Sequence, residues 1–157
     1  SFGEGNFGAL FRSIERDQQK RGYLDKKIKQ GYLCSSQDST TRVRIYGDKA
    51  FLTIKGKTVS ISRAEFEYEI PYEDALSLLK LCKNAIIEKT RYEVKIKNHT
   101  WEIDVFEGAN KGLTVAEIEL SFEDEDFEKP EWLGKEVSHE GKYFNSQLAK
   151  NPFCNWK

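Results

Sequence analysis

Alternation of charged with mostly apolar residues recurs in five segments of the chain, and within each segment the charges are mainly of one sign. Side chains at positions i and i+2 of a strand point to the same face, so each segment predicts a strand with one apolar and one charged face. These segments are residues 42–45, 63–70, 89–92, 101–105 and 115–120. The first and third are basic, and the others are mainly acidic. The sequence therefore predicts a sheet that separates its charges by sign on one face.

Like charges gathered on one sheet face carry an energetic cost that most solvent-facing strands avoid. Neighbours at i and i+2 lie about 6.6 Å apart, and two like charges at that distance repel by about 2.5 kcal/mol at an effective dielectric constant of about 20. We interpret this face as the lining of a cleft or barrel interior that holds a highly charged ligand, with basic side chains for an anion and acidic side chains for metal ions. The alternative is an antiparallel sheet whose charged face simply meets water.

Residues 72–84 predict the main helix, because Ala75, Leu78, Leu79 and Cys82 fall at i, i+3, i+4 and i+7. This apolar stripe requires a partner, and the apolar face of the sheet is available, so we expect helices outside and the charged face turned away from them. Shorter helices are predicted at residues 11–19, 131–137 and 143–150, and further strands at residues 28–34, 49–55 and 86–96. The chain, residues 1–157, is interpreted as one α+β domain on an antiparallel sheet of seven or eight strands, with residues 1–27 poorly assigned.

Composition narrows the classes of function. Charged residues make up 32% of the 157 residues, yet the formal net charge is −1, which argues against a general binder of nucleic acid polymers. No apolar run approaches the ~18 residues of a membrane span, and the first ten residues do not resemble a signal peptide. The cysteines Cys34, Cys82 and Cys154 are widely spaced and odd in number, which predicts neither a zinc site nor a disulfide framework. We expect a cytoplasmic protein without a membrane partner; its oligomeric state stays open, a dimer included.

Several short motifs occur in the order seen in one known family. They are Arg42-Val43-Arg44, Leu52-Thr53-Ile54-Lys55-Gly56, Glu65-Phe66-Glu67, Ile87-Glu88-Lys89-Thr90-Arg91-Tyr92, Trp101-Glu102-Ile103-Asp104-Val105-Phe106 and Ala116-Glu117-Ile118-Glu119. Residues 132–137 and 142–145 resemble the C-terminal part of small bacterial members. Over residues 28–156 the chain resembles the CYTH family, the triphosphate tunnel metalloenzymes named for class IV adenylate cyclases and thiamine triphosphatases.

The resemblance implies an eight-stranded antiparallel β-barrel with helices outside, whose charged tunnel binds a triphosphate-containing small molecule with Mg²⁺ or Mn²⁺. It assigns catalytic roles to Glu67, Glu119 and Tyr32. Metal binding falls to Glu65, Glu67, Glu117 and Glu119. The substrate-binding residues that it implies are Arg42, Arg44, Lys55, Lys89, Arg91, Lys135 and Lys142, of which the last two would close the tunnel. Glu102 and Asp104 are left open, either as site acids or as partners of neighbouring cations.

The chain departs from the family at its N-terminal strand, which has the form Glu-x-Glu-x-Lys. The nearest stretch, residues 13–17, keeps Glu15 but has Ser13 and Asp17 at the other two positions. The leading hypothesis is a metal-dependent hydrolase of inorganic tripolyphosphate or a related substrate, in which charge neutralisation stabilises the phosphoryl transition state. The alternatives are a nucleotide cyclase like the class IV adenylate cyclases and a non-catalytic binder of polyphosphate or nucleotides, which the loss at residues 13 and 17 favours.

Overall fold

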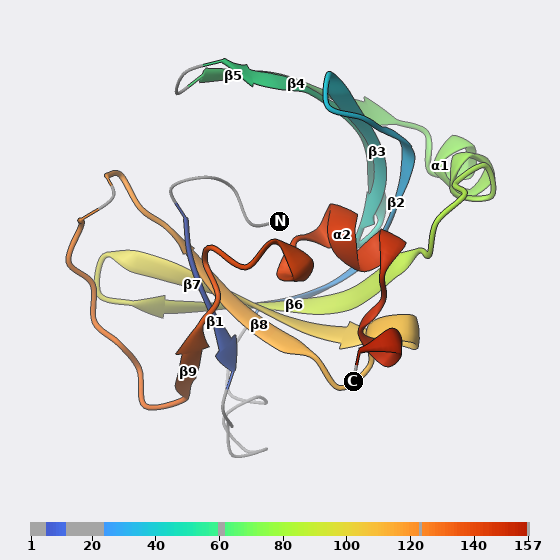
Figure 1. Ribbon diagram of the computed structural model, residues 1–157. Helices are drawn as coiled ribbons and strands as arrows, with labels where there is room; N and C mark the ends of the chain where they lie inside the picture. The colour runs from blue at the N-terminus through green and yellow to red at the C-terminus, as the bar shows by residue number, and fades with distance from the viewer. Residues whose placement is uncertain (1–5, 12–23, 60–61, 123, 157) are drawn as a thin grey trace.

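The computed structural model describes residues 6–11, 24–59, 62–122 and 124–156, and these residues form one nine-stranded sheet in which every neighbouring pair is antiparallel (Figure 1). The strand order is β5-β4-β3-β2-β6-β7-β8-β1-β9. The strands are β1 (Asn6–Phe11), β2 (Leu24–Ser35), β3 (Ser39–Tyr46), β4 (Lys49–Val59), β5 (Ser62–Ile70), β6 (Ile87–Ile96), β7 (His99–Glu107), β8 (Thr114–Glu119) and β9 (Leu133–Glu136).

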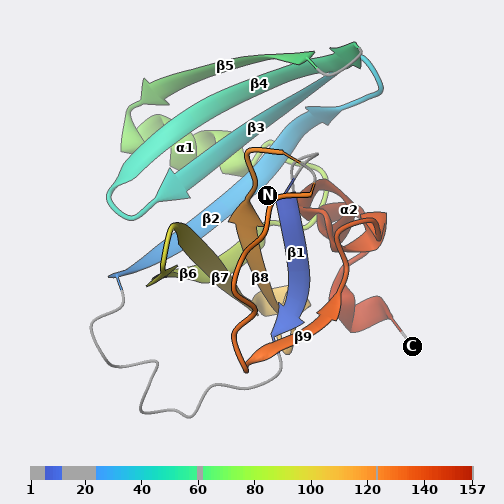
Figure 2. The same cartoon turned by 90° about the vertical axis from the view of Figure 1, so that its left-hand side faces the viewer.

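The sheet curves strongly, so that β4 and β5 lie across from β7, β1 and β9 (Figures 1 and 2). Within the described part of the chain, β5 and β9 are the two edges and do not pair with each other. The predicted antiparallel α+β fold is therefore confirmed, whereas the closed eight-stranded barrel is not observed. Alternation along a strand is the same in an open and a closed sheet, because it reports which face is buried and not which edges meet.

Strands β2 to β5 form the upper half of the sheet, and helix α1 (Tyr72–Leu79) covers its apolar face, as predicted. Its buried residues Ala75 and Leu79 pack with Val43, Ile45 and Ala50 of β3 and β4. The helix ends at Leu79 and not at residue 84, so the predicted helix is too long. The covering is also incomplete, because two large side chains of β5 on this face stay exposed, Phe66 at 53% and Tyr68 at 56%.

Strands β6, β7, β8, β1 and β9 form the lower half of the sheet, and a loop covers its apolar face. Trp101 of β7 is fully buried there, and its ring makes edge contacts with Phe7 of β1 and with Phe127 and Trp132 of the segment that follows β8. The same segment contains strand β9, so the helix predicted at residues 131–137 is wrong. A Cβ on Gly134 would lie 2.7 Å from the carbonyl oxygen of Leu10, so β9 packs closely against β1. The two strands are far apart in the sequence, and no local sequence pattern reveals their pairing.

Helix α2 (Asn145–Lys150) corrects the expectation that the helices pack only outside. Its residues Leu148 and Ala149 belong to an apolar cluster with Tyr32, Ile87 and Phe106. Ile87 and Phe106 flank Lys89 and Asp104 at two-residue spacing, so this cluster lies on the charged face of the sheet. The helix therefore closes one end of the concave face (Figure 1). Short 3-10 turns, η2 (Gly141–Tyr143) and η3 (Phe153–Asn155), flank α2, while η1 (Gly108–Asn110) follows β7.

The N-terminal expectations are tested only in part. Strand β1 ends at Phe11, the first residue of the helix predicted at residues 11–19. Residues 12–23 lie outside the described residues. Among the described helices, none has the length and apolar character needed to cross a membrane.

Candidate functional site

The pairing register brings the predicted charged side chains to one concave face. In the upper half, Arg42 of β3 lies opposite Tyr32 of β2 and Thr53 of β4, and Thr53 lies opposite Glu67 of β5. Directly paired residues of an antiparallel sheet share a face. The hydroxyl of Thr53 donates to Oε2 of Glu67 at 3.4 Å, across the same face. Alternation in the sequence thus placed Arg42 and Glu67 on the same face, as the register shows.

Three buried nitrogen donors of this face have no protein partner among the described residues. They are Nε of Arg42, Nη2 of Arg44 and Nε2 of Gln30. The Nε of Arg44 donates to Oε1 of Gln30 at 2.8 Å. Burial, together with the charges of Arg42 and Arg91, lowers the pKa of Arg44 to about 10. Buried donors are normally hydrogen-bonded, so this group of donors is suited to an anionic acceptor.

In the lower half, the cations predicted to bind phosphate already have protein partners. Nζ of Lys89 lies 2.8 Å from Oδ2 of Asp104, and Arg91 contacts the same carboxylate through Nε at 2.8 Å and Nη2 at 3.0 Å. Nη1 of Arg91 also lies 2.6 Å from Oε2 of Glu102. Of the two roles left open for Glu102 and Asp104, the structure shows the pairing with neighbouring cations.

Charge and burial compete strongly in this network. Burial lowers the pKa of Lys89 to about 7, although the charge of Asp104 acts in the opposite direction. Burial would raise the pKa of Asp104, but Lys89 and Arg91 outweigh it and hold that pKa well below its usual range. Lys89 also lies 3.5 Å from Oδ1 of Asn145, at the start of α2. The helix that closes the concave face therefore reaches the charged network directly.

The acidic side chains occupy two separate places on the same face. Glu117 of β8 lies opposite Glu102 of β7, which in turn lies opposite Glu93 of β6, so three carboxylates form a row across neighbouring strands. Glu119 follows two residues after Glu117, while Glu65 and Glu67 lie exposed on the edge strand β5. Within the described ranges, no group of three such side chains converges tightly enough to hold a metal ion.

The remaining predicted site residues lie around this face. Tyr32 is buried in the apolar cluster beneath α2, and Lys55 of β4 lies opposite Thr40 and Glu65. Two cations predicted to close the tunnel have local partners. Lys135 of β9 pairs with Glu140 at 3.4 Å, and the ammonium of Lys142 lies 4.6 Å from the ring centre of Trp156.

The strand beside β8 is not the stretch that resembles the N-terminal motif of the family. Asn6 and Gly8 of β1 lie opposite Glu119 and Glu117. Residues 13–17, including Glu15, lie outside the described residues. Neither Asn6 nor Gly8 carries a carboxylate, so β1 adds no acid beside those of β8.

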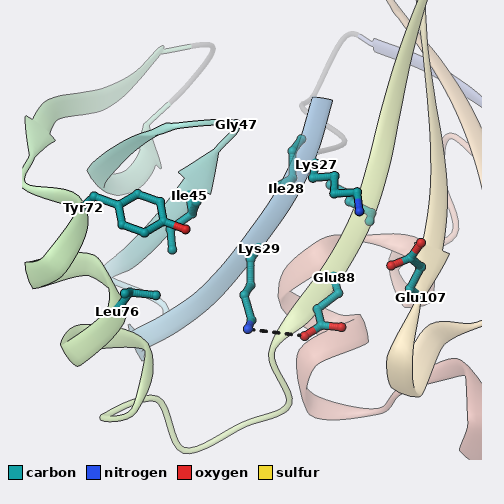
Figure 3. A pocket seen from close by; sticks show the side chains of 10 residues that line it. Lys27, Ile28, Lys29, Ile45, Gly47, Tyr72, Leu76, Glu88 and Glu107 are labelled. Carbon is teal, nitrogen blue, oxygen red and sulfur yellow. Dashed lines mark ion pairs between the residues drawn. The ribbon is translucent and has the colours of Figure 1, made fainter. Parts of the chain in front are cut away.

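A cavity of about 360 Å³ lies on the other face of the sheet, beside α1 (Figure 3). Its lining includes Lys27 and Lys29 of β2, Tyr72 and Leu76 of α1, and Glu88 of β6. Lys29 of β2 and Glu88 of the neighbouring strand β6 pair along its lining at 3.6 Å, and both are about half exposed. The cavity mixes both signs of charge with apolar side chains, and it lies away from the unpartnered donors of the concave face.

Comparison with known proteins agrees with this arrangement. A family model described as the CYTH domain matches residues 12–150. The chain belongs to the CYTH domain family. A relative from Acetivibrio thermocellus, named inorganic triphosphatase, is 48% identical over 130 residues, which cover 82% of this chain and 83% of that protein. A protein of the same name from Nitrosomonas europaea is 35% identical over 126 residues, covering 78% of this chain and 83% of that protein.

A solved structure supports the same family. The crystal structure of an inorganic triphosphatase superposes on this CYTH chain with a TM-score of 0.73 and 29% sequence identity. The match covers 93% of this chain and 97% of the other.

Sequence reasoning missed two buried polar residues of the concave face. Gln30 and Asn145 are both buried, and each contacts a cation of the concave face. Gln30 lies in a predicted strand, and its spacing of two residues from Tyr32 is the one signal that could have placed it on the charged face. Asn145 had no such signal, because only the packing of α2 inside the concave face brings it to Lys89.

Proposed function

We propose that this CYTH protein is a triphosphatase that hydrolyses inorganic tripolyphosphate bound on the concave charged face. The observation that carries the proposal is the pair of buried guanidinium donors on Arg42 and Arg44 without a protein partner. Charge-assisted contacts between guanidinium groups and phosphate oxygens are strong and often bidentate. Both relatives named above carry the name inorganic triphosphatase, which supports the same substrate class.

We propose that a divalent cation, Mg²⁺ or Mn²⁺, is held by carboxylates of the same concave face. Glu102 and Glu117 lie directly opposite each other, an arrangement of like charges that is unfavourable without a cation nearby. Arg91 pairs with Glu102 and its charge also acts on Glu117, so a metal ion would add to positive charge that is already present. Carboxylate oxygens are the ligands that such hard cations prefer. We propose Glu117 and Glu119 as ligands, with Glu65 and Glu67 facing them from the edge strand; the bound cation would neutralise developing phosphate charge.

The protein side chains divide the remaining work. Arg42, Arg44 and Lys55 hold phosphate oxygens and neutralise their charge. Lys89 and Arg91 present further positive charge from positions that Asp104 fixes by its contacts. We propose that Glu67 and Glu119 orient the attacking water, and that Tyr32 acts beside the phosphate. Because the chemistry is phosphoryl transfer, positioning and charge stabilisation supply most of the rate enhancement.

A product assay tests this function and separates it from its alternatives. Purified protein is incubated with tripolyphosphate or ATP, with Mg²⁺, with Mn²⁺ or with excess EDTA. The proposal predicts metal-dependent release of phosphate from tripolyphosphate. It also predicts strong loss of activity in Glu117→Gln, with wild-type rates in the matched surface control Glu73→Gln on α1. Cyclic nucleotide from ATP would indicate a cyclase, and tight binding of tripolyphosphate without any product would indicate a non-catalytic binder.

A further inference from the structure

Gln30 is a buried polar residue whose hydrogen-bonding capacity is only half used. It lies in the middle of β2 with 0% of its surface exposed, opposite Arg44 of β3 and Ile87 of β6. Its Oε1 accepts from Nε of Arg44 at 2.8 Å, whereas its Nε2 has no partner among the described residues. An arginine Nε–H only donates, so the carbonyl of Gln30 faces Arg44 and its amide nitrogen is directed elsewhere.

An unpaired amide donor is costly in a buried position. Its neighbours two residues away on β2, Ile28 and Tyr32, fill the same face with apolar surface. An apolar residue at position 30 would avoid the cost of an unpaired donor. We therefore expect the amide donor of Gln30 to serve a ligand. The free donors nearest in the strand register belong to Arg42 and Arg44, so the common acceptor of this group is an anion.

We infer that Gln30 is a substrate-binding residue of the proposed triphosphatase, and that its Nε2 donates to a phosphate oxygen held by Arg42 and Arg44. This inference rests on the proposed function. A neutral donor adds a hydrogen bond without adding a cation beside Arg42 and Arg44, where burial and then the charge of Arg42 already lower the pKa of Arg44. Gln30 also holds the Nε of Arg44, which leaves Nη2 of that guanidinium for the same anion.

Two substitutions separate direct donation from mere positioning of Arg44. Gln30→Met has a similar volume but neither donates nor accepts. Gln30→Glu keeps an acceptor for Arg44 but removes the amide donor and adds a negative charge. Gln37, exposed in the turn between β2 and β3, provides the matched controls Gln37→Met and Gln37→Glu. Thermal unfolding monitored by circular dichroism checks that each variant is folded. If Gln30→Met does not fold, an unchanged Kd in Gln30→Glu, which retains the contact to Arg44, still overturns the inference.

The readouts are the calorimetric Kd of tripolyphosphate in EDTA, and KM and kcat with added metal ion. Loss of one hydrogen bond to a charged group predicts that Gln30→Met raises Kd and KM about ten- to a hundred-fold. A contact made equally to the bound substrate and to the transition state leaves kcat within about threefold. Gln30→Glu is expected to be at least as severe, and both Gln37 variants are expected to match wild type.

Unchanged Kd in the Gln30 variants would overturn the inference, as would a Gln30→Glu variant that binds better than Gln30→Met, because that order indicates positioning of Arg44 alone. Wild-type hydrolysis with unaffected Gln30 variants leaves the proposed function intact and overturns only this inference. Wild-type binding without hydrolysis overturns the proposed function, while the Kd comparison still decides the role of Gln30. Absence of tripolyphosphate binding by the wild type contradicts both.

Discussion

Removing the charge of Asp104 tests the account of the buried network most severely. The substitution Asp104→Asn keeps the shape of the side chain but takes a negative charge away from Lys89, whose side chain is 0% exposed, and from Arg91. Asp104 is itself only 13% exposed, so solvent gives little compensation. Loss of one member of a surface pair leaves the other in water, whereas this substitution leaves a buried charge without its partner.

The expected loss follows from the contacts that remain. Breaking a buried ion pair by removal of one member costs about 3–5 kcal/mol. Arg91 keeps its contact with Glu102, and Lys89 can lose its proton, since burial already brings its pKa to about 7. We therefore expect the lower end, about 3 kcal/mol of unfolding free energy, under conditions in which wild-type Lys89 is protonated.

The pH dependence has a definite sign. The unfolded chain keeps the proton of Lys89 up to its ordinary pKa of 10.5, whereas the folded wild type loses it near 7. Above about pH 7, Lys89 is neutral in both folded proteins, so the part of the deficit that arises from its charge is absent. The deficit of Asp104→Asn relative to wild type is thus largest below pH 7 and decreases as pH rises through the pKa of Lys89.

Urea unfolding at about pH 6 and about pH 9 measures this deficit on both sides of that pKa. The matched control is Glu102→Gln, because Glu102 pairs with Arg91 but its side chain is 38% exposed; its loss should be about 1 kcal/mol or less. An Asp104→Asn variant as stable as Glu102→Gln at the lower pH, or a deficit that does not depend on pH, would refute the proposed coupling between Lys89 and Asp104.

Three other expectations follow from the structure. Arg42→Ala should raise KM for tripolyphosphate by about tenfold or more, since a hydrogen bond to a charged group contributes about 1.5–3 kcal/mol; wild-type kinetics would place the substrate elsewhere. Excess EDTA should abolish hydrolysis and Mg²⁺ or Mn²⁺ should restore it, and turnover undiminished by chelator would contradict the metal hypothesis. Gly31→Ala should lower the free energy of unfolding by about 1–3 kcal/mol through overpacking, because its Cβ would lie 2.6 Å from Sγ of Cys82. The control Gly141→Ala meets nothing within 4 Å, and equal melting temperatures of the two variants would contradict that packing.

The sequence was most informative where periodicity alone decides the structure. Alternation of charged and apolar residues correctly placed Arg42 and Arg44 on one face of β3 and Val43 and Ile45 on the other, beneath α1. The same rule placed Glu117 and Glu119 on one side of β8. These predictions depend on a two-residue repeat and on burial of one face, both of which are local properties of the chain.

Features that depend on distant contacts were beyond the sequence. The strand β9 was mistaken for a helix because its partner is β1, more than a hundred residues earlier in the chain. Packing of Leu148 against Ile87 puts α2 on the charged face, contrary to expectation. That Lys89 and Arg91 are held by Asp104 requires the register of β6 and β7, which periodicity leaves undefined.

The location of bound tripolyphosphate is the most direct test of the central claim. A crystal structure of the protein with tripolyphosphate and Mn²⁺, whose anomalous signal marks the metal, would show both ligands independently. We predict phosphate density within hydrogen-bond distance of Arg42 and Arg44 on the concave face, with the metal beside Glu117. Phosphate density in the cavity beside α1, between Lys27 and Lys29, would contradict the account.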